Sequence, residues 1–239
     1  MNNARGKTFY RKFFRYTGPL IKLYHRAESF GAENLPPAGA PFILAPNHTN
    51  WFGWDALLLS SILEDHEVSW VSWDYEEELP LWHRAVALFD PIFCGAGKQF
   101  PYRRVCEEVL GRGGVVGIFP EGNNNTMKDW YRLRPFFPGC VRLAVLSGAP
   151  VVPVSVAGIE EASPIILAKE NPGEPITDIV APPFPLPTKA VVRFGAPFHP
   201  RLNEADLGSV ETLQSAARDL QLRVLELLRN DRPGARAES

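Results

Sequence analysis

Short apolar runs alternate with longer amphipathic stretches along most of this chain. Apolar runs bounded by glycine, proline or polar residues are typical of buried strands, and apolar residues spaced three or four apart are typical of helices. On this basis we expect strands over 42–45, 67–73, 91–94, 115–119, 150–158 and 190–195. We expect helices over 55–65, 80–89, 100–114, 139–148 and 204–229. This alternation indicates an α/β layer structure, and we find no internal repeat and no second domain.

The segment 160–188 breaks the alternation, because it contains seven prolines. Proline removes a backbone donor and fixes φ, so we expect no regular element over most of this length. A loop this long in a compact domain often forms a lid or a binding wall, and is otherwise poorly ordered. The helix that follows has one apolar side, formed by Leu207, Val210, Leu213, Ala217, Leu220 and Val224. We expect residues 231–239 to form a disordered tail.

Aromatic and basic residues are mixed over residues 7–27. Apolar side chains recur there at helical spacing, and we expect a break at Gly18-Pro19. These apolar side chains are Phe9, Phe13, Tyr16, Leu20 and Leu23. One interpretation is a terminal helix packed on the domain. The other is a membrane anchor, in which aromatic rings enter the headgroup region while Lys and Arg meet anionic lipid.

Charge is unevenly distributed along the 239 residues. The first 30 contain seven Lys or Arg and one acid, a net charge of +6; because the whole chain carries −2, the remainder carries −8. The small overall charge argues against general nucleic-acid binding. The composition is 45% hydrophobic, which is ordinary for a globular domain whose core needs no disulfide or metal.

The three cysteines, Cys94, Cys106 and Cys140, form no CxxC pair. An odd number without paired spacing argues against a disulfide framework and a zinc cluster, and favours a reduced cytosolic setting. Basic residues interrupt the apolar runs at the N-terminus, so we expect no signal peptide. No run approaches the length of about 18 apolar residues that a membrane-spanning helix requires.

Polar residues follow two apolar runs directly, in "APNHTNWFGWD" (45–55) and "VVGIFPEGNNNT" (115–126). Ligands collect at the carboxyl ends of strands in open α/β sheets, so we expect His48 and Glu121 on one rim. Taken singly, each has a structural explanation, because a lone histidine is more often structural and Pro-Glu-Gly makes a tight turn. Together they indicate acid–base chemistry, in which an imidazole is the general base and a carboxylate holds its other nitrogen. Asp55 is the candidate for that carboxylate.

The order and spacing of these motifs resemble those of the glycerolipid acyltransferases, the group that includes the 1-acylglycerol-3-phosphate acyltransferases. That family's Asn-His and Asp, its Phe-Pro-Glu-Gly turn and its Val-Pro-Val strand are similar to Asn47-His48, Asp55, Phe119-Pro120-Glu121-Gly122 and Val152-Pro153-Val154. The resemblance spans roughly residues 28–200. It implies a single-domain mixed sheet flanked by helices over 31–230, preceded by a basic amphipathic, membrane-associating helical segment over 1–30.

The resemblance also implies an activity: transfer of a fatty acyl group from acyl-CoA or acyl carrier protein to a hydroxyl of a lysophospholipid-type acceptor. His48 would remove the hydroxyl proton, the oxygen would attack the thioester without an acyl-enzyme, and Asp55 would orient His48. Glu121 and Gly122 would shape the acceptor site, with backbone N–H groups at the oxyanion. No cofactor, metal or prosthetic group is implied. The implied partners are the lipid acceptor, the acyl donor and the cytoplasmic face of a membrane, where the protein is peripheral, and no nucleic acid.

The spacing of His48 and Asp55 departs from the family pattern, with six intervening residues in place of four. On one continuous helix the two would share a face but lie roughly 10 Å apart, which is too far for direct contact. We expect a bulge at Phe52-Gly53 to extrude two residues and restore the pair, because glycine tolerates unusual dihedrals.

The residues after the Phe-Pro-Glu-Gly turn depart from the pattern as well. The family's Thr-Arg-Ser, whose arginine is expected to hold a phosphate, is replaced by Asn123, Asn124 and Asn125. Amides such as that of Asn123 bind hydroxyls but bring no charge. The substitute phosphate ligands on offer are Lys98, Arg103 and Arg104, which otherwise form a solvated helix face.

Three alternatives follow from these departures. The acceptor can be neutral, such as a glycolipid or a carotenoid glycoside. The chain can be a catalytically lapsed lipid- or acyl-carrier-binding protein on the same fold. It can also be a thioesterase in which water replaces the acceptor, the reading we favour least because the chain has no Gly-x-Ser-x-Gly nucleophile elbow.

Overall fold

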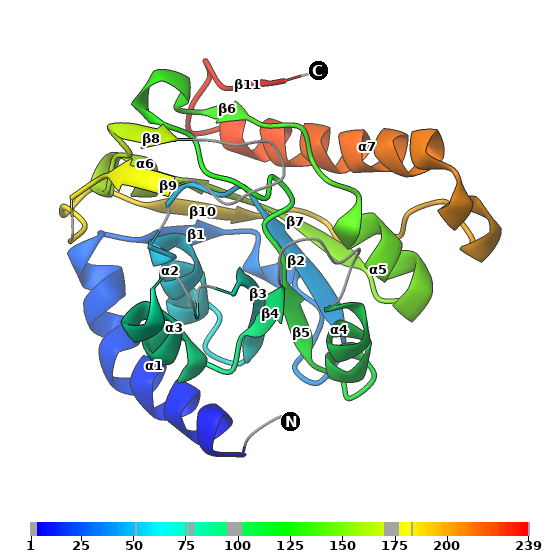
Figure 1. The fold of residues 1–239 in the computed structure, drawn as a ribbon, viewed down its shortest axis with the longest axis horizontal. Coiled ribbons are helices and arrows are strands. Elements are labelled where there is room, and N and C mark those ends of the chain that lie inside the picture. Colours follow the sequence, from blue (N-terminus) through cyan, green and yellow to red (C-terminus); the bar gives the residue numbers. More distant parts are fainter. Residues whose placement is uncertain are drawn as a thin grey trace.

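A mixed sheet runs through the middle of the molecule (Figure 1). The computed structural model describes residues 4–50, 52–74, 76, 79–94, 102–169, 177–182 and 184–238. Seven strands of the described part lie in the order β1-β10-β7-β2-β5-β3-β4. Their bounds are β1 (Glu28–Phe30), β2 (Phe42–Pro46), β3 (Val68–Trp73), β4 (Ile92–Cys94), β5 (Val115–Gly117), β7 (Val151–Ala157) and β10 (Val191–Phe194).

Strands β7, β2, β5, β3 and β4 are parallel neighbours, whereas β10 runs antiparallel to β7. The edge strand β1 is parallel to β10. In the centre of the sheet, Leu44 of β2 lies beside Gly117 of β5 and Val152 of β7. The α/β fold with a mixed sheet, expected from the sequence, is therefore confirmed.

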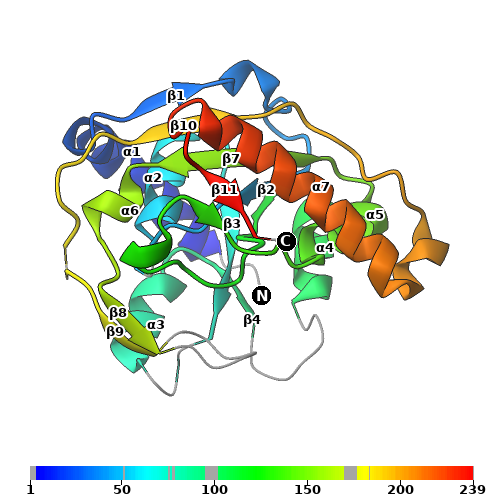
Figure 2. The same cartoon turned by 90° about the horizontal axis from the view of Figure 1, so that it is seen from above.

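Helices cover both faces of the sheet (Figures 1 and 2). The long helix α7 crosses one face and shares it with α4 and α5, while α1 and α2 lie on the other face. The helix bounds are α1 (Ala4–Tyr24), α2 (Trp54–Ile62), α3 (Pro80–Ala87), α4 (Arg103–Leu110), α5 (Gly139–Ser147), α6 (Ile159–Ala162) and α7 (Val210–Arg229). Short 3-10 turns are η1 (Ala32–Asn34), η2 (Met127–Asp129) and η3 (Glu204–Gly208).

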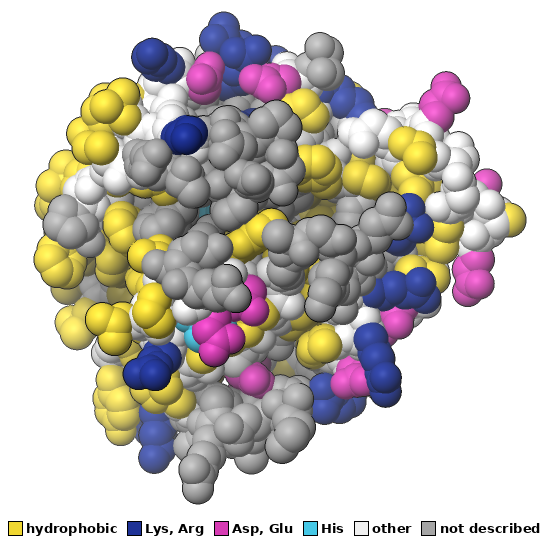
Figure 3. Space-filling model, in the orientation of Figure 1, with side chains coloured by type: hydrophobic (Ala, Val, Ile, Leu, Met, Phe, Trp, Pro, Cys, Tyr) yellow, Lys and Arg dark blue, Asp and Glu magenta, His cyan; other side chains and the backbone are white. Residues whose placement is uncertain are grey.

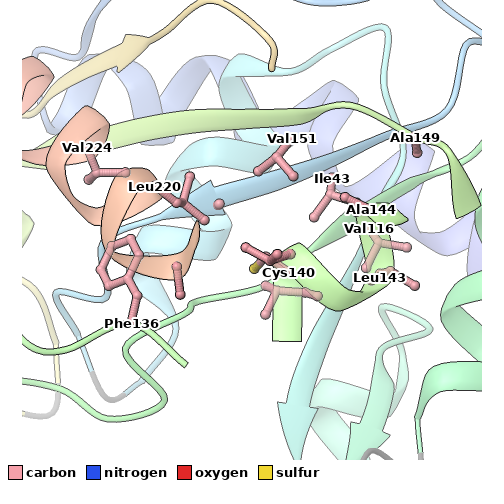
Figure 4. Close-up of a cluster of buried hydrophobic side chains, with 14 of the residues drawn as sticks. Ile43, Val116, Phe136, Cys140, Leu143, Ala144, Ala149, Val151, Leu220 and Val224 are labelled. Atoms are coloured by element: carbon pink, nitrogen blue, oxygen red, sulfur yellow. The ribbon is translucent and has the colours of Figure 1, made fainter. Parts of the chain in front are cut away.

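Two apolar cores form because successive strand side chains point to opposite faces of the sheet. In β2, Ile43 and Ala45 join the core under α4, α5 and α7, while Phe42 and Leu44 join the core under α2. Figure 4 shows the first core, in which Leu220 and Val224 of α7 lie over the sheet with the α5 side chains. Burial on both faces explains why the central strands read as continuous apolar runs.

The break expected at Gly18-Pro19 is wrong, because α1 continues through Pro19 to Tyr24. Proline costs a helix one hydrogen bond, and packing on a neighbour offsets this cost. Here Gly18 lies against Ser61 of α2, where an added Cβ would be 3.7 Å from the nearest Ser61 atoms. Tertiary packing has overridden the local signal.

The helix expected over 204–229 is also divided. Residues 204–208 form the 3-10 turn η3, and Ser209 then caps α7 by accepting a hydrogen bond from the Thr212 N–H (3.2 Å). Val210 is 78% exposed, so it does not belong to the apolar side, whereas Leu213 and Leu220 are buried as expected. The serine cap resets the helical phase, which periodicity alone does not detect.

Within 160–188 the structure describes the short helix α6 and the antiparallel pair β8 (Leu167–Lys169) and β9 (Thr177–Val180). Residues 170–176 and 183 lie outside the described residues, so the expectation of irregular chain applies only to the remainder. Among the described residues, no helix combines the length and the apolar character needed to cross a membrane.

The disordered tail expected over 231–239 is wrong for its described part, 231–238. Strand β11 (Arg236–Ala237) pairs in parallel with β6 (Arg132–Leu133), and both lie beside α7 in Figure 1. Asp231 accepts two hydrogen bonds from the Arg193 guanidinium, at 2.7 and 2.8 Å. A bidentate ion pair of this kind fixes the direction in which the chain leaves α7.

Candidate active site

The carboxyl ends of three neighbouring strands carry the polar residues that the sequence pointed to. β2 leads into Asn47-His48, β5 leads into the turn that contains Glu121, and β7 leads into α6. The two loops expected on one rim do meet: the His48 backbone N–H donates to Glu121 Oε1 at 2.8 Å. The side-chain amide of Asn47 fastens the loop to β7: its Nδ2 donates to Val156 O (2.9 Å), and its Oδ1 accepts the Val156 N–H (2.7 Å).

His48 and Asp55 are in direct contact, as the sequence analysis expected despite the long spacing. His48 Nδ1 lies 2.8 Å from Asp55 Oδ2, and the Asp55 side chain is fully buried. Since the carboxylate accepts the proton on Nδ1, the lone pair of the ring resides on Nε2. A histidine held in this tautomer is suited to act as a general base.

The two extra residues are absorbed before the helix begins. Gly53 adopts a positive φ of 70°, and α2 starts only at Trp54, which places Asp55 in its first turn. Asn50 closes the preceding turn, since its Oδ1 accepts the Phe52 N–H at 2.9 Å. The rearrangement expected at Phe52-Gly53 is therefore present, and a carboxylate in the first turn also gains from the helix dipole.

Two stacked aromatic rings, those of Phe119 and Trp70, support the imidazole of His48. The His48 ring lies 4.1 Å from the Phe119 ring, and the Trp70 ring lies 5.0 Å beyond it, with small interplanar angles. Trp70 is fixed by a hydrogen bond from its Nε1 to Ser60 Oγ (3.0 Å). Gly117 makes room for it, because a Cβ there would fall 2.3 Å from the Trp70 ring. Sequence reasoning missed the role of Trp70, which lies on another strand.

Glu121 acts as a clamp between loops. It is buried, and its second oxygen accepts the Arg134 N–H at 2.8 Å, so both carboxyl oxygens are bound to backbone amides. Burial raises the pKa of Glu121 to about 7, and the two amides oppose that rise. The neighbouring Gly122 needs its positive φ of 70° for the turn, and it lies against Phe137.

The asparagine run has three different environments. Asn124, which stands where the family has its arginine, is buried, and its Nδ2 has no hydrogen-bond partner among the described residues. Asn125 accepts the Arg134 Nε–H at 2.9 Å and lines the pocket described below. Asn123 is half-buried beside them.

Arg103 and Arg104, two of the three cations that the sequence offered as phosphate ligands, do not lie at His48. Arg103 and Arg104 pair with Glu107 (2.8 Å) and Glu108 (3.2 Å) one turn further along α4, and neither lines the His48 pocket. This corresponds to the solvated helix face that was the alternative explanation. Lys98 lies outside the described residues.

A small pocket opens beside His48. Its lining is largely polar and consists of Asn47, His48, Thr49, Glu121, Asn125, Trp130, Tyr131, Arg132, Leu133 and Glu160. Arg132 is the cation of this lining, and it is already paired with Asp129 (3.2 Å) and Glu238 (2.9 Å). The pocket therefore offers hydrogen-bonding groups more than free positive charge.

Glu160 is one of the pocket residues that the sequence analysis missed. It is buried, its Oε2 accepts the Gly158 N–H at 3.0 Å, and burial raises its pKa to about 8. Glu160 follows β7 as His48 follows β2, so applying the strand-end rule to every strand finds it.

One group of possible metal ligands is found among the described residues, and none of its members lines the His48 pocket. Asp74, Glu76 and His83 bring one ligand atom each within 4.8 Å of one another. Within this group, His83 Nδ1 lies 3.1 Å from Asp74 Oδ1, and the His83 ring stacks on Phe93.

A family model described as acyltransferase matches residues 26–157. Among curated proteins, the chain is 30% identical to an uncharacterized protein of Mycobacterium leprae, over 83% of this chain and 56% of that one. It is 31% identical to an uncharacterized protein of Mycobacterium tuberculosis, over 74% and 53%. The chain spans about half the length of these curated relatives.

Two further relatives have names that state an activity. The chain is 27% identical to a chloroplastic 1-acyl-sn-glycerol-3-phosphate acyltransferase of Brassica napus, over 64% of this chain and 45% of that one. The crystal structure of the 1-acyl-sn-glycerophosphate (LPA) acyltransferase PlsC of Thermotoga maritima superimposes with a TM-score of 0.59. This match covers 91% of this chain and 82% of the other at 20% identity, so it shows a shared fold.

We expect Glu160→Gln to make the stability of the protein less dependent on pH. Because the folded-state pKa of Glu160 is about 8 and its ordinary value is 4.5, between these values the folded state holds a proton that the unfolded state has lost. Stability therefore falls as pH rises through this window, by roughly 2–4 kcal/mol for this group. The free energy of unfolding, measured by urea denaturation from pH 5 to 9, should fall less steeply in the variant.

Glu211→Gln is the matched control, since Glu211 is exposed at the start of α7. It should keep the wild-type slope. Equal slopes in the wild type and in Glu160→Gln would contradict a buried, proton-holding Glu160.

Proposed function

The chain belongs to the acyltransferase family, and we propose that it transfers a fatty acyl group from acyl-CoA or acyl carrier protein to a lipid hydroxyl. The observation that carries this proposal is the 2.8 Å contact between His48 Nδ1 and the buried Asp55 carboxylate at the edge of a polar pocket. This contact leaves Nε2 as the ring nitrogen available to a hydroxyl group. His48 is the general base in this proposal, and Asp55 orients it.

The reaction proceeds by direct transfer. His48 Nε2 takes the proton of the acceptor hydroxyl as its oxygen forms a bond to the thioester carbonyl carbon. Asp55 stabilises the imidazolium that results. The tetrahedral intermediate then expels the thiolate, which takes the proton from His48, so the products are an ester and a free thiol.

The backbone N–H groups of residues 48–50 are already engaged. The backbone N–H of His48 is bound to Glu121, and those of Thr49 and Asn50 point to Asp55 Oδ2, at 2.9 and 3.3 Å. These amides therefore hold the Glu121 and Asp55 carboxylates and are not available to bind the oxyanion of the transition state. Other N–H groups of the pocket would have to fill this role.

For the acceptor we propose a lysophospholipid-type lipid, which the names of the Brassica and Thermotoga proteins support. A neutral glycolipid or carotenoid glycoside is the second candidate. It is favoured by the burial of Asn124 at the position of the family's arginine, and by the ion pairs that already engage Arg132.

We also propose that the protein works as a peripheral protein at the cytoplasmic face of a membrane. Four apolar side chains of α1 are exposed: Tyr16, Leu20, Leu23 and Tyr24. Phe184 and Leu186 extend this surface, because the Tyr24 hydroxyl donates to Pro185 O (2.9 Å) and so ties α1 to that segment. We call these six side chains the α1 apolar surface, and Figure 3 shows hydrophobic side chains gathered on this side of the molecule.

Basic residues border the α1 apolar surface. Lys12, Arg15 and Arg26 are exposed on or just after the same helix. Apolar side chains flanked by Lys and Arg suit a bilayer that contains anionic lipid. The earlier alternative, a helix that only packs on the domain, accounts for the buried Tyr10 and Phe14 but not for this exposed side.

We expect His48→Ala to lower acceptor-dependent thiol release by about 10²–10⁴-fold, because the general base is lost. The measurement is thiol release from a panel of acyl-CoAs and acyl carrier proteins, each with lysophosphatidate, with a neutral glycolipid and without acceptor. His199→Ala is the control, since His199 is exposed, and it should retain wild-type rates.

Two results of this assay would count against an acyltransferase. Release that does not depend on an acceptor would indicate a thioesterase. Absence of release in the wild type, together with lipid binding that survives His48→Ala, would indicate the non-catalytic binding protein.

Asp55→Asn should lower kcat by about 10²–10⁴-fold with little change in KM, because an amide cannot stabilise the imidazolium as a carboxylate does. Asp65→Asn, an exposed acid just beyond α2, is the matched control. A kcat within threefold of wild type in Asp55→Asn would show that the pair is structural only.

The double variant Leu20→Gln/Leu23→Gln should bind vesicles of phosphatidylcholine and phosphatidylglycerol about 10-fold more weakly or worse, because two exposed apolar side chains are lost. Co-sedimentation at low and high salt is the measurement, and higher salt should weaken wild-type binding. Val210→Gln, equally exposed but on α7, should bind like wild type. Unchanged partitioning of the double variant would exclude the α1 apolar surface as the membrane contact.

A further inference from the structure

We propose that Glu160 is a specificity-determining residue of the pocket, whose carboxyl group binds a second hydroxyl of the acceptor head group beside the hydroxyl that receives the acyl group. The inference rests on the proposed function, because it places the reacting hydroxyl at His48. Of the two acceptors proposed above, it favours the neutral one over a lysophospholipid that ends in a phosphomonoester. It names the acceptor chemistry as a polyol head group, either glycerol or a sugar. A head group in which a phosphomonoester replaces this second hydroxyl would be a poor fit.

The first support is the position of Glu160. It lines the same pocket as His48 and Glu121, but it comes from a third strand end, that of β7. The turn before it is rigid, because Gly158 has a φ of 94° and a Cβ at Gly158 would fall 2.0 Å from Lys189 O. The carboxyl group is therefore held at a fixed place on the pocket wall.

The second support is a contrast with Glu121. Both oxygens of Glu121 are occupied by backbone N–H groups. Glu160 accepts the Gly158 N–H on Oε2 and also interacts with its own backbone N–H, and no side chain of the described residues donates to it. Glu121 therefore joins two loops, whereas the donors to Glu160 come from its own turn, and a ligand hydroxyl can complete the hydrogen bonding of this buried group.

The third support is the charge of the surroundings. Arg232, which faces Glu160, is paired with Glu161 at 3.1 Å, and the Tyr131 hydroxyl also donates to Glu161. Arg132 is paired as well, so the positive charges near Glu160 are already balanced by acids. A phosphate beside two buried carboxyl groups would meet no unpaired cation in the described lining.

A hydroxyl fits this environment better than a phosphate does. It both donates and accepts a hydrogen bond, and a carboxyl group that titrates near neutral pH can also do both. Sites that hydrogen-bond a substrate hydroxyl discriminate strongly against analogues that lack it, because the buried group is left unpaired.

The test compares acceptors that share one reacting secondary hydroxyl and differ only at the neighbouring carbon. They are 1-O-octylglycerol, its 3-deoxy analogue and 1-O-octylglycerol 3-phosphate, with octyl glucoside added as a sugar source. We measure kcat and KM for each with wild type, Glu160→Ala, Glu160→Gln and the surface control Glu211→Gln. Binding of each acceptor without donor is measured by calorimetry.

The wild type should favour octylglycerol over the deoxy analogue and the phosphate by 10-fold or more in kcat/KM. Glu160→Ala should bring the ratio of kcat/KM for octylglycerol to that for the deoxy analogue within twofold of unity. The change should come mainly from a higher KM for octylglycerol, with a smaller effect on the deoxy analogue. Glu160→Gln should keep part of the preference, because an amide also donates and accepts. A larger rate with octyl glucoside than with octylglycerol would identify a sugar as the source of the second hydroxyl.

Several outcomes would overturn the inference. A wild-type preference below twofold would do so, and so would an equal loss on both acceptors in Glu160→Ala, which would indicate a structural role. If no acceptor is acylated but calorimetry shows the same preference and its loss in Glu160→Ala, the proposed function fails and the inference stands. If neither transfer nor selective binding occurs, both fail.

Discussion

The buried carboxylate of Asp55 is the constraint on which the rest of the site depends. One of its oxygens faces four donors: His48 Nδ1, the backbone N–H groups of Thr49 and Asn50, and the Thr49 hydroxyl. Without them a fully buried carboxylate would be prohibitively costly, so the loop must fold around it. The same contacts orient the His48 imidazole and lie at the beginning of α2. They also engage the backbone N–H groups of Thr49 and Asn50. Function and local folding are therefore supported by one group.

Two further polar clamps carry this arrangement across the sheet. Glu121 joins the His48 loop to the chain at Arg134, and Asn47 joins it to β7. Each clamp is buried and each uses side-chain atoms to satisfy backbone groups, which makes the loops as well defined as the strands that bear them. The stacked rings of Phe119 and Trp70 pack against the His48 ring and restrict its orientation. The loops at this edge of the sheet are therefore largely buried and fixed by hydrogen bonds, as the core strands are.

Much of the fold and of the site was predictable from the sequence, because the signals that identify them lie in short stretches of the chain. The apolar runs identified the central strands, and the strand-end rule with the family resemblance identified His48, Asp55 and Glu121. The failures have tertiary causes. Helix α1 passes through Pro19 because α2 packs against Gly18, and β11 exists because β6 is there to pair with it. Glu160 was missed because it carries no motif, although it follows a strand as His48 does, and Trp70 because its partner Phe119 is distant in sequence.

The pairing of β11 with β6 has a consequence for how the protein is made. Tyr131 O and Leu133 O accept hydrogen bonds from the N–H groups of Arg236 and Glu238, so a wall of the pocket is completed by residues more than 100 positions later. A chain emerges from the ribosome from its N-terminus, and the sheet and the core under α2 can assemble before those residues appear. The nascent protein would then hold the sheet with an open pocket wall. Its competence to hold a substrate would arrive only once residues 236–238 had been synthesised.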